Sequence, residues 1–337
     1  MTDYTDLSMR ELCEELCNKK NTLIVYHVRS DADAIGSAFA LRDILVKMGS
    51  RAYCACSDKI PERLAFLSKD VQSGVDILDM PFEAERIISV DSASPAQLGR
   101  IYDCLSGKID IMIDHHGLGT RYADGYIDPS ASATGEIIFE IAKALIEMGK
   151  LDKMTDSAVR CIYAAISSDT GCFRFSNATP KTYRIAAELL EMGACAVDIN
   201  HRLFESKGLS QIRAEGEAVK RLKTWKDGLI ASVVFPYSAK KELDLIDENL
   251  ETIIDIPRSL AGVEIAFVVR QPEDTGHFRV SMRSAGEWNV ASVCAEFGGG
   301  GHKKAAGCSI EAENIEKAEK MVIEAIEKHL LNTETIE

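Results

Sequence analysis

The sequence lacks any apolar run approaching the roughly 18 residues that a membrane-spanning helix needs. Its first residues, Met-Thr-Asp-Tyr-Thr-Asp, are acidic rather than basic, which argues against a secretory signal peptide. We therefore expect a cytoplasmic protein with no membrane partner.

Paired cysteines are also missing. The chain has 10 cysteines but no C-x-x-C pair, the spacing that is typical of zinc clusters. Because these cysteines are scattered through apolar contexts, the sequence predicts neither a disulfide framework nor a zinc cluster.

Positive charge is scarce. The 39 Lys and Arg residues face 53 Asp and Glu residues, which gives a net charge of −14. Proteins that wrap long nucleic acid rely on an excess of basic side chains, so this composition argues against that class. A short anionic substrate held by metal ions and a few local cations remains compatible with it.

The expected fold follows from apolar runs that alternate with helical patterns. With 337 residues, 46% apolar, the chain is long enough for two globular domains. The alternation predicts a doubly wound, mainly parallel α/β domain followed by a smaller α/β domain. The predicted elements of the first domain include strands at residues 22–27, 87–90 and 109–113 and helices at residues 38–48, 134–149 and 155–167.

The first group of candidate ligands follows the first predicted strand. His27 ends this strand, and Asp31 and Asp33 are expected in the turn after it. Ligands of open α/β sheets bind outside the carboxyl ends of the strands, which is where these side chains fall. Acids in such a turn are also common helix caps, so this segment alone leaves both interpretations open.

Further acids and histidines follow the later elements. Asp91 comes directly after a buried strand, although an Asp followed by Ser and Pro is by itself more typical of a helix cap. Asp114, His115 and His116 end the next strand, and three consecutive titratable groups there favour a ligand or catalytic role. Asp169 is expected in a Gly-containing turn.

Carboxylates and imidazoles gathered at one sheet edge need cations. Carboxylates at contact distance repel one another and so raise one another's pKa. Bound divalent metals relieve this repulsion. Mixed imidazole and carboxylate ligation suits Mn, Fe, Co or Zn better than Ca, which prefers oxygen alone.

Together these segments resemble the motifs of the DHH phosphoesterase family, in the same order and at ordinary spacings. The family takes its name from the Asp-His-His triplet. The matching segments are His27-x-x-x-Asp31-x-Asp33-x-x-Gly36-Ser37, Asp91-Ser92-Ala93, Asp114-His115-His116 and Ser168-Asp169-Thr170-Gly171.

The C-terminal part is similar to the DHH-associated substrate-binding domain of nanoRNase and pAp-phosphatase (NrnA-type) proteins. The similarity covers residues 278–284, 289–291 and 297–307. We expect a catalytic domain at residues 1–194, a helical linker at 195–226 that lets the C-terminal domain close over the metal site, and the substrate-binding domain at 227–337.

Two features of the C-terminal part also suit a phosphate on physical grounds. A run of glycines lets several backbone amides turn toward one anion, although an isolated glycine run is more typical of a flexible loop. Arg283 lies on the polar face of an alternating strand, where it is either a simple exposed arginine or a bidentate phosphate ligand.

The resemblance implies a two-metal hydrolase of phosphoesters. It implies that Asp91 bridges the two divalent ions, most simply Mn²⁺, with Mg²⁺ or Co²⁺ as alternatives. Asp114 would orient the imidazoles, and His116 would stabilise phosphorane charge or protonate the leaving oxygen. The implied ligands are His27, Asp31 and Asp91 for one ion and Asp33, Asp91, His115 and Asp169 for the other, and the implied substrate-binding residues are Arg283, Gly299, Gly300, Gly301 and His302.

The resemblance favours short oligoribonucleotides (nanoRNA) as substrates, cleaved to mononucleotides, with 3'-phosphoadenosine 5'-phosphate as a second substrate. The enzymatic alternative is hydrolysis of a cyclic dinucleotide such as cyclic di-AMP, or of its linear dinucleotide product. A nucleotide-binding sensor without turnover is an alternative of another class. The complete set of metal ligands argues against it, because a pure binding module need not retain them. The resemblance also allows a homodimer.

Overall fold

The chain divides into two compact units, Met1–Ser206 and Lys207–Glu337. The computed structural model describes residues 4–69, 73–74, 79–117 and 119–333. The predicted linker, residues 195–226, contains helix α7 (Ala196–Asn200), a π-helical turn at His201–Glu205, helix α8 (Leu209–Lys220) and strand β7 (Leu222–Trp225). Among the described residues, no helix combines the length and the hydropathy of a membrane span.

The first unit is built on a 6-stranded sheet in the order β3-β2-β1-β4-β5-β6, and every neighbouring pair is parallel. From β1 the chain proceeds outward in one direction, and from β4 it proceeds in the other, so the order reverses between these two strands. The strands are β1 (Thr22–Tyr26), β2 (Ala52–Ala55), β3 (Ser73–Gly74), β4 (Arg86–Val90), β5 (Ile111–Asp114) and β6 (Asp124–Ile127).

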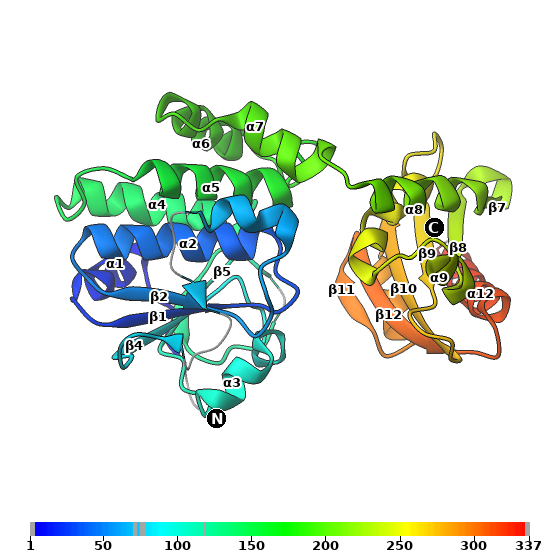
Figure 1. The fold of residues 1–337 in the computed structure, drawn as a ribbon, viewed down its shortest axis with the longest axis horizontal. Helices are drawn as coiled ribbons and strands as arrows, with labels where there is room; N and C mark the ends of the chain where they lie inside the picture. The colour runs from blue at the N-terminus through cyan, green and yellow to red at the C-terminus, as the bar shows by residue number, and fades with distance from the viewer. Residues whose placement is uncertain (1–3, 70–72, 75–78, 118, 334–337) are drawn as a thin grey trace. The chain divides into compact units, whose positions relative to one another are not determined.

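Helices cover both faces of this sheet (Figure 1). The side chains of β1 alternate between two cores: Ile24 packs with α1, α2, α4 and α5, whereas Leu23 packs on the other side, with α3. This arrangement confirms the predicted doubly wound, mainly parallel domain. The helices are α1 (Met9–Cys17), α2 (Ala32–Lys47), α3 (Arg100–Cys104), α4 (Thr134–Glu147), α5 (Asp156–Asp169), α6 (Pro180–Glu191) and α7 (Ala196–Asn200).

Two sequence-based boundaries near the site are wrong. Helix α2 begins at Ala32 rather than at residue 38, because the Asp31 side chain caps it by accepting hydrogen bonds from the backbone N–H groups of Asp33 and Ala34 at 3.0 Å. Asp33 therefore lies in the first helical turn and not in a loop. Asp169 is the last residue of α5 instead of a turn residue.

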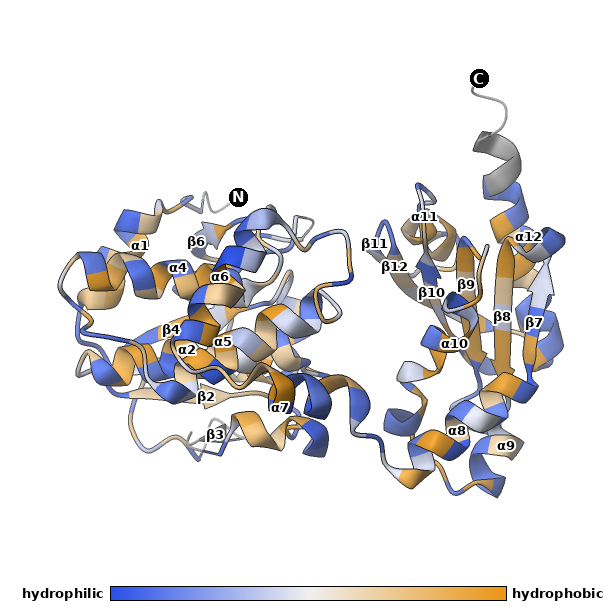
Figure 2. Ribbon diagram, turned by 90° about the horizontal axis from the view of Figure 1, so that it is seen from above, coloured by the Kyte–Doolittle hydropathy of each residue, from blue (hydrophilic) through white to orange (hydrophobic). Residues whose placement is uncertain are grey.

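The second unit contains a mixed 6-stranded sheet in the order β11-β12-β10-β9-β8-β7. Strands β8 and β9 pair in parallel, and the other neighbouring pairs are antiparallel. Helices α11 and α12 pack on one face and α8 and α9 on the other, and Figure 2 shows β8 and β9 as strongly apolar strands between these layers. Its elements are α8 (Leu209–Lys220), β7 (Leu222–Trp225), β8 (Ile230–Phe235), α9 (Tyr237–Glu242), α10 (Asp255–Arg258), β9 (Ile265–Arg270), β10 (His277–Ser284), α11 (Val290–Ala295), β11 (Gly300–His302), β12 (Ala305–Glu311) and α12 (Ile315–Thr333).

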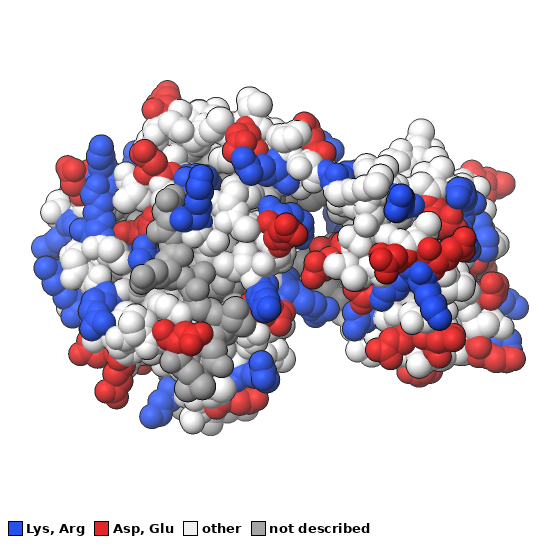
Figure 3. Space-filling view, viewed as in Figure 1, with Lys and Arg blue, Asp and Glu red and all other residues white. Residues whose placement is uncertain are grey.

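Acidic and basic side chains are interspersed on the face of the molecule that Figure 3 shows. The described residues of that face form no continuous basic surface, which agrees with the net charge of −14. A surface of this kind does not favour a long polyanion over other ligands.

Candidate metal centre

The candidate ligands gather where the strand order of the first sheet reverses. His27 directly follows β1, Asp91 directly follows β4, and Asp114 is the last residue of β5. These strands are neighbours and parallel, so their carboxyl ends lie at the same edge. This crevice is the usual ligand site of an open α/β sheet.

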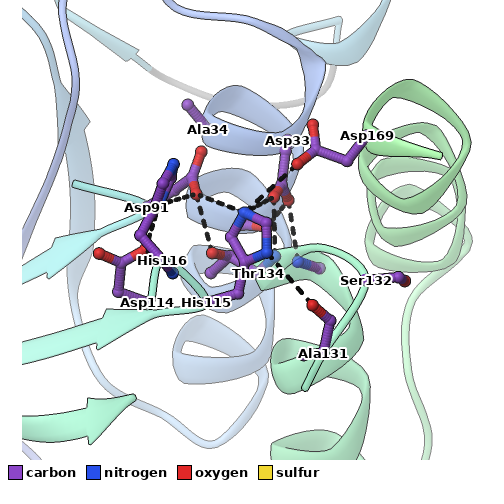
Figure 4. Close-up of polar contacts among 12 residues, drawn as sticks. Asp33, Ala34, Asp91, Asp114, His115, His116, Ala131, Ser132, Thr134 and Asp169 are labelled. Carbon is purple, nitrogen blue, oxygen red and sulfur yellow. Dashed lines mark hydrogen bonds and ion pairs between the residues drawn. The ribbon is translucent and has the colours of Figure 1, made fainter. Parts of the chain in front are cut away.

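Two helices bring the remaining acids to the same place. Asp31 is the N-cap residue of α2. Asp33 lies in the first turn of that helix, and Asp169 ends α5 (Figure 4). The two helices cross closely at Gly36, where a Cβ atom would lie 2.5 Å from the carbonyl oxygen of Cys161. The close crossing explains why residues far apart in the sequence share one site.

One set of ligand atoms surrounds the His27 ring. Its Nε2 atom lies 3.5 Å from Asp91 Oδ2 and 3.8 Å from Asp31 Oδ1. Its Nδ1 atom lies 2.9 Å from the carbonyl oxygen of Val28, so donation of the Nδ1 proton to that carbonyl leaves Nε2 with the lone pair that a metal needs.

A second set surrounds His115. Its Nε2 atom lies 3.3 Å from Asp169 Oδ2, 3.7 Å from Asp91 Oδ1 and 3.8 Å from Asp33 Oδ2. Its Nδ1 atom is 3.3 Å from the carbonyl oxygen of Ala131. Asp91 thus faces His27 with one carboxylate oxygen and His115 with the other.

The donor atoms fit metal binding. Three groups of possible ligands each keep their atoms within 4.8 Å of one another among the described residues. The groups are Asp91, His115 and His116; His27, Asp31 and Asp91; and Asp33, His115 and Asp169. Mixed imidazole and carboxylate donors of this kind suit a divalent transition metal.

The electrostatics of the cluster also fit a cation site. Burial alone lowers the pKa of His27, but hydrogen bonds and charges from Asp31 and Asp91 outweigh it and raise this pKa to about 12. Burial raises the pKa of Asp33 well above its usual range, and the charges of Asp91 and Asp169 add to this effect. The acids therefore require protons or cations beside them, and a divalent ion meets that requirement.

Asp114 and His116 form a pair beside these ligands. Asp114 Oδ1 lies 2.7 Å from His116 Nδ1 and also accepts a hydrogen bond from the His116 backbone N–H at 3.2 Å. Burial lowers the pKa of His116, but the bond to Asp114 outweighs it and the pKa is raised. The two contacts of Asp114 with His116 thus orient the His116 ring, while the Ala131 carbonyl orients His115.

Sequence reasoning missed the start of helix α4 as part of the site. Its N-cap residue, Ala133, has no side-chain acceptor. Asp33 takes that role, because its carboxylate accepts hydrogen bonds from the backbone N–H groups of Thr134 at 2.7 Å and Gly135 at 2.9 Å. The Thr134 hydroxyl donates to Asp91 at 2.9 Å. The sequence did offer one signal: the residue before the predicted helix, Ala133, has no side chain that could cap it, so a distant acceptor is needed.

The predicted substrate-binding residues all lie in the second unit. Arg283 is half-buried near the end of β10, where burial lowers the pKa of its guanidinium. Gly299 and Gly301 are required by packing, since a Cβ atom there would lie 2.3 Å from the Gly307 carbonyl oxygen and 2.5 Å from that of Ala305, respectively. Gly300 has nothing within 4 Å of such an atom.

Part of the glycine run is a strand. Residues Gly300–His302 form the exposed edge strand β11, which pairs with β12. An edge strand presents unpaired backbone N–H and C=O groups to its surroundings. Binding of an anion by these amides stays a prediction.

Comparison with known proteins agrees with this architecture. Residues 21–166 match a family model described as the DHH family, N-terminal domain, and residues 227–328 match the DHHA1 domain. A Thermus thermophilus protein named bifunctional oligoribonuclease and PAP phosphatase NrnA is 30% identical, and the match covers 91% of this chain and 89% of that protein. The Bacillus subtilis protein of the same name is 29% identical, with 88% and 92% covered.

Two other similar proteins are named for different activities. A Listeria monocytogenes protein named cyclic-di-AMP phosphodiesterase PdeA is 23% identical, and the match covers 94% of this chain but 49% of that protein. The crystal structure of an exopolyphosphatase-related protein from Bacteroides fragilis superposes with a TM-score of 0.86 at 26% identity and covers 98% of both chains.

Proposed function

The chain belongs to the DHH family, and from that membership we propose that it is a metal-dependent phosphoesterase that hydrolyses short oligoribonucleotides to mononucleotides. One observation carries the proposal. Asp91 presents one carboxylate oxygen to His27 and the other to His115, so the two ligand sets share a residue. We assign two divalent ions to these sets, most simply Mn²⁺.

Ions bound there would supply Lewis-acid activation of water and would neutralise charge on the phosphoryl group. The protein's own contribution is orientation and proton transfer. Asp114 holds His116 through Nδ1 at 2.7 Å, and we assign the other ring nitrogen of His116 to protonation of the leaving oxygen. We assign Arg283, the glycine amides and His302 to a terminal phosphate or nucleotide of the substrate.

The proposed substrate class can be tested directly. We would incubate the Mn²⁺-loaded full-length protein with labelled RNA dimers to pentamers, a 24-residue RNA, 3'-phosphoadenosine 5'-phosphate, cyclic di-AMP and polyphosphate, and analyse the products. We expect mononucleotides from the short RNAs while the long RNA is largely spared. The Asp91→Asn variant, prepared in parallel, controls for contaminating nucleases.

Three other results would each revise the proposal in a defined way. Consumption of cyclic di-AMP alone would favour the activity for which the Listeria relative is named. Release of phosphate from polyphosphate alone would move the substrate class away from nucleotides. Nucleotide binding without turnover of any substrate would favour a sensor.

A substitution at Arg283 tests the role of the second unit. We expect Arg283→Ala to raise KM for an RNA trimer by about 10- to 100-fold with little change in kcat, because a lost charge-assisted hydrogen bond removes about 1.5–3 kcal/mol of substrate binding. The matched control is Arg279→Ala on the same face of β10, where the exposed Arg279 lies 3.5 Å from Asp247. Equal KM values for both variants would contradict the assignment.

A further inference from the structure

A buried carboxylate lies next to the candidate metal centre and has no role in the proposed chemistry. Glu136 belongs to the first turn of α4 and has no exposed surface (0%). A glutamate is almost never fully buried unless its charge is paired and hydrogen-bonded. Its surroundings therefore indicate why the chain keeps an acid at this position.

Glu136 joins three parts of the first unit. Its Oε2 atom accepts hydrogen bonds from the Ser132 hydroxyl at 2.7 Å, from the Ser132 backbone N–H at 3.3 Å and from the Thr182 hydroxyl of α6 at 3.1 Å. Its Oε1 atom lies 3.2 Å from Nζ of Lys181, also on α6. The carboxylate thereby ties the segment before α4 to helix α6.

The segment that Glu136 holds, residues 131–135, contacts ligands of both proposed ions (Figure 4). The carbonyl oxygen of Ala131 lies 3.3 Å from His115 Nδ1. The Thr134 hydroxyl donates to Asp91, and the Thr134 backbone N–H donates to Asp33. A shift of this segment would consequently turn the His115 ring and remove donors from two acids.

We propose that Glu136 is a positioning residue that fixes segment 131–135 and, through it, the orientation of His115, Asp33 and Asp91. The inference rests on the proposed metal centre. Loss of a group that orients metal ligands commonly lowers metal affinity by about 10- to 100-fold, because the ligands then no longer point at the ion before it binds. Without the carboxylate, the Ser132 and Thr182 donors lose their acceptor and the segment relaxes.

The test compares three variants of the full-length protein by calorimetric titration with Mn²⁺, thermal unfolding and steady-state kinetics. Glu136→Leu removes the acceptor, and we expect its Mn²⁺ affinity to fall by about 10- to 100-fold. Glu136→Gln keeps one oxygen that can accept the same three hydrogen bonds, so we expect it to recover most of that affinity. We expect kcat to fall in Glu136→Leu and to recover in Glu136→Gln, while KM for the substrate changes little in either variant.

Glu140→Leu is the matched control. Glu140 lies one turn further along α4 and also pairs with Lys181, at 2.8 Å, but its side chain is part-exposed. Among the described residues, no hydrogen bond or ion pair joins it to segment 131–135. We expect its Mn²⁺ affinity to equal that of the wild type. If Glu136→Leu does not fold, Ser132→Ala replaces it in the test, because this variant removes the donor of the 2.7 Å hydrogen bond to Glu136. We expect it to weaken Mn²⁺ binding about tenfold.

The outcomes separate this inference from the proposed function. Wild-type Mn²⁺ affinity in Glu136→Leu, or in Ser132→Ala where the first variant does not fold, would overturn the positioning role even if the melting temperature falls. Equal losses in Glu136→Gln and Glu136→Leu would overturn the hydrogen-bond mechanism. A wild-type chain that binds no Mn²⁺ would overturn the metal centre itself.

Discussion

An Asp91→Asn variant will lose turnover by about a thousandfold or more while the protein stays folded. Asp91 is almost fully buried, and its two carboxylate oxygens lie 3.5 Å from His27 Nε2 and 3.7 Å from His115 Nε2. An amide has the same shape but carries no charge and offers one oxygen instead of two. The variant therefore cannot serve both ligand sets at once.

Asparagine is the informative replacement because the backbone at Asp91 is unusual. Its φ angle is +54°, in the left-handed region that asparagine tolerates and alanine does not favour. The amide oxygen can also keep the hydrogen bond from the Thr134 hydroxyl. A loss of activity in Asp91→Asn thus reports on the charge and the second oxygen rather than on backbone strain.

The measurement is kcat for an RNA trimer at saturating Mn²⁺, together with the number of ions bound per chain. Asp58→Asn is the control, since Asp58 lies in the neighbouring loop after β2, is exposed and accepts a hydrogen bond from the Arg29 backbone N–H. It should leave kcat unchanged. Turnover in Asp91→Asn within about tenfold of wild type would contradict a shared ligand.

The part of the site that sequence reasoning predicted depends on strand ends. Short continuous apolar runs predicted β1, β4 and β5, and parallel neighbouring strands must end at one edge. His27, Asp91 and the residues after β5 therefore had to converge if the sheet formed. This inference needs only local patterns and one rule of sheet geometry.

The part that was missed depends on contacts between distant residues. Thr134 and Gly135 donate to Asp33 across more than 100 residues of sequence. No local pattern shows which acid will cap helix α4, whose N-cap residue, Ala133, has no side-chain acceptor. Strand β6, with the sequence Asp-Gly-Tyr-Ile, escaped prediction because it contains no apolar run. Its place at the sheet edge is set by pairing with β5.

A Gly36→Ala variant will lower both the stability of the first unit and its affinity for Mn²⁺. Gly36 lies inside α2, where alanine would normally favour the helix by about 1 kcal/mol. Here the added Cβ atom would lie 2.5 Å from the backbone carbonyl oxygen of Cys161 and 3.3 Å from Cβ of Ala165. Since a backbone atom cannot swing aside, α2 and α5 must separate.

The separation acts on the metal centre because each helix carries a candidate ligand beside His115. Asp33 Oδ2 lies 3.8 Å and Asp169 Oδ2 lies 3.3 Å from His115 Nε2, and these two acids come from α2 and α5. We expect the free energy of unfolding to fall by about 1–3 kcal/mol, the usual cost of overpacking. Mn²⁺ binding should weaken even at temperatures where the variant is fully folded.

Urea unfolding and Mn²⁺ titration of the same preparations measure both effects. The control is Gly216→Ala in α8, a helical glycine whose added Cβ atom would have nothing within 4 Å. It should stabilise the second unit by about 0.5–1 kcal/mol and leave Mn²⁺ binding unchanged. If Gly36→Ala behaves like this control, the close crossing of α2 and α5 does not determine where Asp33 and Asp169 meet. If Gly36→Ala loses stability and Mn²⁺ affinity while the control does not, helix packing explains the glycine at position 36. The close approach of α2 and α5 at this glycine then sets the distance between Asp33 and Asp169.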